Sequence, residues 1–272
     1  MLYFLIAAGF SLIFGLMSVL NLAHASFFLW GAYSGLAIFT FTGNFTLAVI
    51  GATIVGVIMG LLVEYLTLRP LYGKHLFQIL MTLGLLLVFE ELVKLIWGTT
   101  ILGFPRPEVL TGSLVILGRY FPVYRIFIII AGIVVFIVVY LILNRTKIGI
   151  TVRAGVEDEE MVQALGIDIR KVFSGVFGLG AGLAALGGVI GAPFLGVYPE
   201  LGFEMLVPAL IVVIIGGLGS FHGSFVGAII IGLSQSFGGY FIPEFALAIN
   251  VALLAIVLLI KPTGLFGMEG GH

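Results

Sequence analysis

Long apolar runs separated by short polar breaks cover almost the whole chain. An apolar run of about 18 residues or more can span a bilayer as an α-helix. The runs predict spans at residues 2–20, 26–41, 45–66, 77–97, 126–143, 172–191, 205–215, 223–241 and 245–260. The chain is therefore predicted to be an all-α polytopic membrane protein with eight or nine transmembrane helices, forming one domain over residues 1–272. The number stays open because the breaks at 21–26 and 216–223 can be interruptions at membrane depth or true loops.

Composition supports this interpretation. The chain is 61% hydrophobic and 9% charged, with a mean hydropathy of +1.28, which excludes a water-soluble domain of this size. A net charge of −1 argues against nucleic acid as a partner. The absence of cysteine excludes disulfides and thiolate metal sites. Met1 leads directly into apolar sequence without a charged region or cleavage site, so the first segment is expected to be a retained helix.

One segment, residues 144–171, holds ten of the chain's 25 charged residues and is named the polar loop below. Five of the ten are basic, which places this loop in the cytosol by the preference of Lys and Arg for that side. The segment 98–125 then lies outside, and Arg69, Lys74 and Lys261 fall on the cytosolic side. A loop of this size is where a soluble partner could bind.

The polar loop contains a predicted helix at residues 156–165, bracketed by Gly155 and Gly166. Acidic residues 157–160 fill its first turn, where the helix dipole favours negative charge. Met161 and Leu165 are four residues apart and share a face. An exposed apolar face on a short helix suits a groove in a partner protein. The alternative, a helix lying on the membrane surface, would favour basic residues on the polar face.

Two breaks between apolar runs carry polar and small residues. Residues 21–27 and 216–225 both end in His-small-Ser-Phe, at His24 and at His222. Interrupted helices in corresponding positions of two halves often mark a transport site, so these breaks predict a substrate pathway and allow an inverted repeat. Two ordinary tight turns are the alternative. The pathway residues expected from the breaks are Asn21, His24, Ser26, Gly216, Gly217, Gly219 and Ser220.

Motifs for catalysis are absent from the sequence. There is no phosphate-binding loop, no HExxH metal site and no G-x-S-x-G elbow with an evident base. We therefore expect no catalytic residues, no metal and no cofactor, and any ATP hydrolysis must belong to another chain.

Among the acidic residues near the spans, Glu90 is expected to pair with Lys94 and Glu64 with Arg69. An ion-coupled secondary transporter or channel would need relayed acids in several helices, and the sequence lacks them.

Five motifs in order resemble the permease subunits of branched-chain amino acid ABC transporters. The resemblance covers nearly the whole chain. The first two motifs are Asn21-Leu22-Ala23-His24 and Glu64 followed by Arg69-Pro70-Leu71. The third lies in the polar loop and consists of Lys147-x-Gly149, Arg153-Ala154, Glu157-Asp158 and Gly166-Ile167. The last two are Gly216-Gly217-Leu218-Gly219-Ser220-x-x-Gly223 and Lys261-Pro262-Thr263-Gly264-Leu265-Phe266-Gly267. Ile150 and His222 depart from the family pattern.

The resemblance implies a multi-pass importer subunit in the cytoplasmic membrane that is not itself an enzyme. It implies a second permease subunit, homologous or identical, two cytosolic ATPase subunits and an extracytoplasmic substrate-binding protein. The substrate would be a branched-chain amino acid, with urea, short amides or another small solute as the alternative. The ATPase-coupling residues it implies are Arg153, Ala154, Glu157, Asp158, Met161, Leu165, Gly166 and Ile167.

The predicted topology can be tested with single cysteines, because the chain contains none. We expect a membrane-impermeant thiol reagent applied to intact cells to label Glu108→Cys and to leave Glu159→Cys unlabelled until the membrane is opened. Labelling of position 159 but not of position 108 would reverse the topology.

Overall fold

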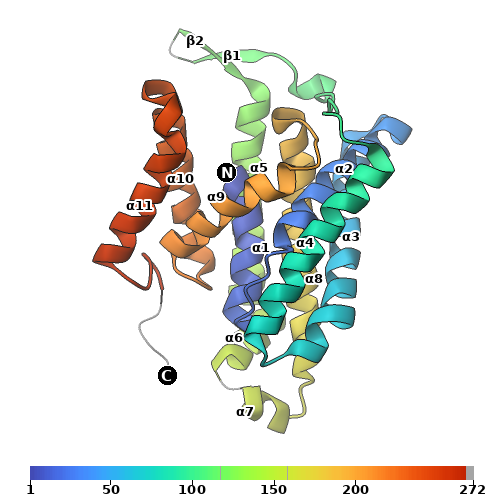
Figure 1. Cartoon of the computed structure of the whole chain (residues 1–272), viewed down its shortest axis with the longest axis vertical. Coiled ribbons are helices and arrows are strands. Elements are labelled where there is room, and N and C mark those ends of the chain that lie inside the picture. Colours follow the sequence, from blue (N-terminus) through green and yellow to red (C-terminus); the bar gives the residue numbers. More distant parts are fainter. Residues whose placement is uncertain (117, 158, 268–272) are drawn as a thin grey trace.

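The computed structural model describes residues 1–116, 118–157 and 159–267 as a helical bundle (Figure 1). In chain order its helices are α1 (Leu2–Met17), α2 (His24–Thr42), α3 (Phe45–Val63), α4 (His75–Trp97), α5 (Val123–Arg145), α6 (Lys147–Glu157), α7 (Glu159–Ala164), α8 (Ile169–Leu195), α9 (Leu201–Gly216), α10 (Phe221–Phe241) and α11 (Ala246–Ile260). A π-helical turn η1 (Glu64–Leu68) and a 3-10 turn η2 (Arg69–Leu71) extend α3. Two further 3-10 turns are η3 (Glu108–Leu110) and η4 (Pro243–Phe245).

Each of the nine predicted apolar segments forms a helix, which confirms the all-α membrane fold. Five helical segments are long and apolar enough to cross a membrane by length and composition, namely α2, Phe45–Leu71, α5, α8 and α10. By contrast, α1 has 16 residues and is about 24 Å long, shorter than a hydrocarbon core of about 30 Å. The shorter helices α1 and α9 are the two that end at the predicted breaks.

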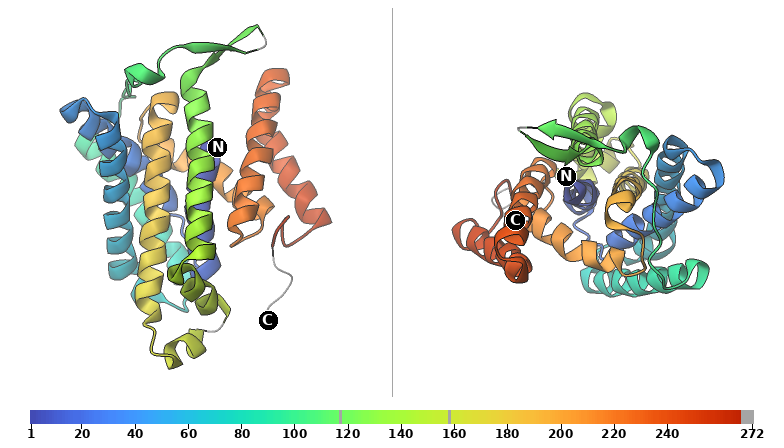
Figure 2. Two further views of the ribbon diagram at one scale, coloured as in Figure 1. Left: turned by 180° about the vertical axis from the view of Figure 1, so that it is seen from behind. Right: turned by 90° about the horizontal axis from the view of Figure 1, so that it is seen from above.

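Helix α1 occupies the middle of the bundle, and most of its residues are buried. It packs against α5, α8, α9 and α10, and the view from above shows it enclosed by these helices (Figure 2). Helix α8 supplies the other half of the core by packing on α1, α2 and α3. The core of the bundle is therefore built around two helices from opposite halves of the chain.

Small residues allow the backbones along α8 to approach closely. A Cβ atom added to Gly9 would lie 2.2 Å from the carbonyl oxygen of Gly180, and one added to Gly188 would lie 1.9 Å from that of Phe28. A Cβ atom at Gly56 would similarly lie 2.3 Å from the Cβ of Ala185. Lipid provides little hydrophobic drive between helices, so such contacts stabilise membrane bundles through close packing.

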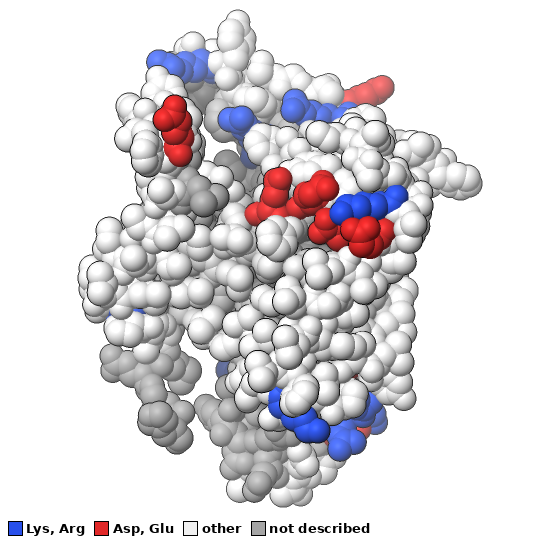
Figure 3. Space-filling model, in the orientation of Figure 1, with Lys and Arg blue, Asp and Glu red and all other residues white. Residues whose placement is uncertain are grey.

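The two ends of the bundle differ in structure. One end carries α6 and α7, and the other carries a hairpin of β1 (Ser113–Ile116) and β2 (Arg119–Pro122), in which Leu114 pairs with Phe121 (Figure 1). The sequence predicted an external segment there and no strands. Charged side chains gather toward both ends and leave a broad uncharged band between them on the face drawn (Figure 3). This distribution suits a chain that crosses a membrane with its ends in water.

The glycine packing can be tested at Gly188. We expect Gly188→Ala to lower the free energy of unfolding by about 1–3 kcal/mol, because the added methyl group overlaps the backbone of α2. The matched control is Gly84→Ala on α4, where a Cβ atom meets nothing within 4 Å. Thermal unfolding of the two purified variants in one detergent measures the difference, and equal melting temperatures would contradict the packing account.

Candidate functional site

The polar loop folds into two short helices instead of the single predicted helix. Helix α6 runs through Gly155, so the prediction that a helix starts after this glycine is wrong. The reason is packing: a Cβ atom on Gly155 would lie 2.7 Å from the Cδ1 of Ile169 and 3.7 Å from the Cδ1 of Leu16. The missing side chain lets α6 lie directly against α8 and the end of α1.

The predicted helix stop at Gly166 is confirmed. Gly166 has φ +80°, and its amide donates to the carbonyl of Gln163, while the amide of Ile167 donates to the carbonyl of Val162. These two bonds form a Schellman motif that ends α7. Met161 on α7 and Leu165, the first residue after it, are 58% and 73% exposed, so the apolar pair faces solvent as predicted.

Other residues of the predicted coupling set hold the loop in place. The guanidinium of Arg153 donates to the carbonyl of Leu143 at 2.5 Å and to Oδ1 of Asn144 at 3.1 Å, which fastens α6 to the end of α5. Ala154 is half-buried and packs against the core. Two members of the set, the side chain of Glu157 and the whole of Asp158, lie outside the described residues.

Asp168 begins α8, the helix that leaves the polar loop. Its carboxylate caps the helix by accepting from the amide of Arg170 at 3.2 Å and pairs with Lys171 at 3.5 Å. Desolvation raises the pKa of Asp168, but the hydrogen bonds from Lys171 and Arg170 outweigh it and hold the pKa below its ordinary value. The carboxylate therefore stays charged at neutral pH and fixes the start of α8.

The first break, between α1 and α2, is buried and polar. His24 donates from Nε2 to the carbonyl of Ile6 at 3.1 Å, and the amide of Leu22 donates to Oγ1 of Thr82 at 3.2 Å. Both polar atoms of the Asn21 side chain, Nδ1 of His24 and Oγ of Ser26 are buried without a hydrogen-bond partner within the described structure. Buried polar atoms nearly always have partners, so these four atoms set the first break apart from the second.

The second break, between α9 and α10, is a packing junction. Gly217 and Gly219 have φ +104° and +81°, which glycine adopts without strain. A Cβ atom on Gly219 would lie 2.9 Å from the Cα of Gly15, and one on Gly216 would lie 2.3 Å from the backbone of Gly223. A side chain at position 219 would therefore displace α1. A larger residue there would disturb helix packing as well as any passage of substrate.

Polar groups at the second break are satisfied. Oγ of Ser220 accepts from the amide of Gly223 at 3.0 Å, and the hydroxyls of Ser11 and Ser224 are hydrogen-bonded to each other across α1 and α10. The amides of Leu265 and Phe266 donate to the last carbonyls of α9, at 2.8 and 2.9 Å. The sequence did not indicate this role of the C-terminal segment 261–267.

The polar loop and the second break meet at the last turn of α1. A Cβ atom on Gly155 of the polar loop would lie 3.7 Å from the Cδ1 of Leu16, and the backbone of Gly15 packs against Gly219 of the second break. The first break begins at Asn21, four residues after α1 ends at Met17. The polar loop and the second break therefore both lie against the last turn of α1.

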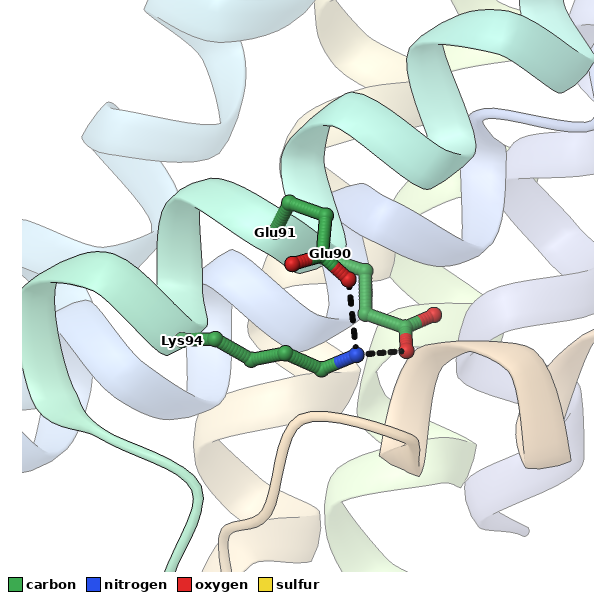
Figure 4. Close-up of polar contacts among 3 residues, drawn as sticks. All are labelled: Glu90, Glu91 and Lys94. Carbon is green, nitrogen blue, oxygen red and sulfur yellow. Dashed lines mark hydrogen bonds and ion pairs between the residues drawn. The ribbon is translucent and has the colours of Figure 1, made fainter.

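Two predicted ion pairs have different outcomes. The Nζ of Lys94 lies 2.9 Å from Glu90, as predicted, and also 2.9 Å from Glu91 (Figure 4). The predicted pair of Glu64 with Arg69 is wrong. Glu64 turns inward at the π-helical turn and accepts from the hydroxyls of Tyr72 at 2.5 Å and Ser174 at 2.6 Å. Arg69 instead lies over the ring of Tyr65, 5.3 Å from its centroid.

Comparison with known proteins gives one consistent result. A family model described as the permease component of the branched-chain amino acid transport system matches residues 1–260. The chain is 27% identical to LivH, a high-affinity branched-chain amino acid transport system permease protein of Escherichia coli K12, over 97% of this chain and 91% of that one. It is 29% identical to a probable branched-chain amino acid transport permease protein, LivH, of Methanocaldococcus jannaschii, over 97% and 88% of the two chains. No solved structure matches.

The position of Glu64 can be tested by double-mutant cycles on thermal unfolding. We expect Glu64→Ala and Ser174→Ala to show a coupling free energy of about 1–2 kcal/mol, because each substitution removes the same charge-assisted hydrogen bond. The cycle of Glu64→Ala with Arg69→Ala is the control and should show coupling near zero. A larger coupling free energy for Glu64 with Arg69 than for Glu64 with Ser174 would instead support the Glu64–Arg69 ion pair expected from the sequence.

Proposed function

Because this chain belongs to the family of permease components of branched-chain amino acid transport systems, we propose that it is the membrane-spanning subunit of an ATP-binding cassette importer. It translocates branched-chain amino acids across the cytoplasmic membrane as a multi-pass protein. The match over residues 1–260 is the observation that carries this proposal, and the named relatives supply the substrate class. Cytosolic ATPase subunits, an extracytoplasmic binding protein and a second permease subunit complete the importer.

The polar loop is the coupling element to the ATPase. Support comes from the exposed apolar face of α7 at Met161 and Leu165, held on a helix that the Schellman turn at Gly166 ends sharply. Gly166 and Ile167 thus set the direction in which α7 projects, and Arg153 and Ala154 fix α6 to the bundle. Glu157 and Asp158 belong to the same coupling set by their place in the sequence, just before α7. A groove on the ATPase that binds this face would pull on α1 and α8 together.

The two breaks form the substrate pathway, with different tasks. Asn21, His24 and Ser26 offer buried polar atoms that lack partners, which suits the charged ends of an amino acid in an otherwise apolar passage. Gly216, Gly217, Gly219 and Ser220 form the adjacent hinge, where backbone contacts replace side chains. Irregular backbone at membrane depth is tolerated where it is buried or lines a cavity, and both breaks meet that condition.

The coupling role is tested by Met161→Asp combined with Leu165→Asp. Burial of the two side chains in a partner contributes on the order of 2–4 kcal/mol, so the double variant should release the ATPase and abolish uptake. The control is Val109→Asp combined with Leu114→Asp, two exposed apolar residues at the opposite end of the bundle. Co-purification of the ATPase is measured alongside uptake of labelled leucine and urea. A bound ATPase with normal uptake would exclude α7 as the coupling site.

The pathway role of the first break is tested by Asn21→Leu. Replacing an unpartnered buried amide by an apolar side chain of similar size should leave the melting temperature equal or higher. We expect leucine uptake to fall at least ~10-fold, because a polar contact to the substrate costs about 1.4 kcal/mol or more when lost. The control is Ser224→Ala, which loses a satisfied hydrogen bond and should lower stability while preserving uptake. Uptake at the wild-type rate in Asn21→Leu would remove the first break from the pathway.

A further inference from the structure

An apolar groove opens beside the polar loop and has no role in the proposed pathway. It has a volume of about 790 Å³ and lies between the ends of α5 and α8, with α6 and part of α1 as its floor. Its apolar lining residues include Leu12, Ile142, Leu143, Val152, Val172 and Val176. The view from behind shows α5 and α8 running side by side toward α6 (Figure 2).

Helix α8 presents a glycine, Gly175, to the groove. A Cβ atom on Gly175 would meet nothing within 4 Å, and Gly175 lines the groove. Apolar walls without neighbouring atoms lose dispersion contacts, so an apolar occupant is favoured there. The walls come from helices that border the membrane, which makes an acyl chain the occupant of matching chemistry.

The rim of the groove is charged and polar on the side of the polar loop. Lys147 and Lys171 lie there with one carboxylate, that of Asp168, so the rim carries a net positive charge. Asp168 pairs with Lys171, while no residue in the described part of the chain pairs with Lys147. The hydroxyl of Thr146 donates to the carbonyl of Ile142 at 2.6 Å, and that of Thr151 donates to the carbonyl of Lys147 at 3.0 Å.

We propose that this groove binds an anionic phospholipid of the cytosolic leaflet. One acyl chain lies against Gly175 and the apolar wall, and the phosphate lies between Lys147 and Lys171. Basic pockets between membrane helices on the cytosolic side bind anionic headgroups in this way. The orientation is taken from the proposed function. Because the groove is lined by Ile167 and Asp168 as well as by α5, the bound lipid braces the coupling element against the bundle.

Lipid retention tests the proposal without any measurement of transport. The assembled complex is placed in nanodiscs of phosphatidylcholine containing phosphatidylglycerol, extracted in mild detergent, and its retained lipids are identified by mass spectrometry. We expect phosphatidylglycerol to be enriched over its share in the nanodisc. Lys147→Gln should lower the affinity about fivefold, the effect of about 1 kcal/mol for one lysine near an anionic headgroup. Lys74→Gln, a substitution outside the groove, should leave the affinity for phosphatidylglycerol unchanged.

Two further variants distinguish binding of the lipid headgroup from binding of the acyl chain. Asp168→Asn keeps a good N-cap for α8 and removes the opposing charge, so enrichment should rise. Gly175→Leu fills the groove and should abolish retention, whereas Gly84→Leu also adds a side chain in open space and should retain the lipid.

Several outcomes would overturn the proposal. These are no enrichment of phosphatidylglycerol by the wild-type complex, enrichment by Lys147→Gln equal to that by the wild type, or full lipid retention by Gly175→Leu. A photoactivatable cross-linker attached at Gly175→Cys should capture lipid, and capture of a protein chain would make the groove a subunit interface instead. Failure of the coupling test with phosphatidylglycerol still enriched would exclude α7 as the coupling site and leave the lipid site standing.

Discussion

Close backbone contact along α8 is the constraint on which the rest of this structure depends. Apolar side chains gain little by leaving lipid for one another, so the bundle needs contacts that only small residues permit. The approaches of Gly9 to Gly180, of Gly188 to Phe28 and of Gly56 to Ala185 supply them from three different helices. These contacts hold α1, α2 and α3 against α8. Larger residues at these positions would separate the helices and leave the first break open to lipid.

The same geometry makes the end of α1 a mechanical junction. Leu16 contacts the polar loop through Gly155, and Gly15 contacts the second break through Gly219. The first break begins four residues after α1 and is held to α4 by the hydrogen bond from the amide of Leu22 to Oγ1 of Thr82. Tightly packed elements move between discrete arrangements more readily than they deform. A shift of the polar loop of an ångström or two would therefore reach both breaks through one helical turn.

Much of this organisation was predictable from the sequence because it depends on local chemistry. Apolar runs give the helices, Gly166 adopts positive φ at a helix end, and Glu90 lies one turn from Lys94. The predictions failed where a distant neighbour decides the outcome. Gly155 looks like a helix boundary but serves contact with Ile169, and Glu64 turns toward Ser174, 110 residues away, instead of the nearby Arg69. The unpartnered atoms of Asn21 and Ser26 likewise follow from burial that a sequence does not display.

The most direct test of the junction is the amount of leucine transported per ATP hydrolysed by the reconstituted complex carrying Leu16→Ala. Leu16 is buried and touches the polar loop, and Leu36→Ala on α2 is a control of similar burial. The account predicts that the ATPase still co-purifies with Leu16→Ala and hydrolyses ATP, while leucine transported per ATP falls well below the control. An unchanged ratio would contradict the claim that the polar loop acts on the pathway through the end of α1.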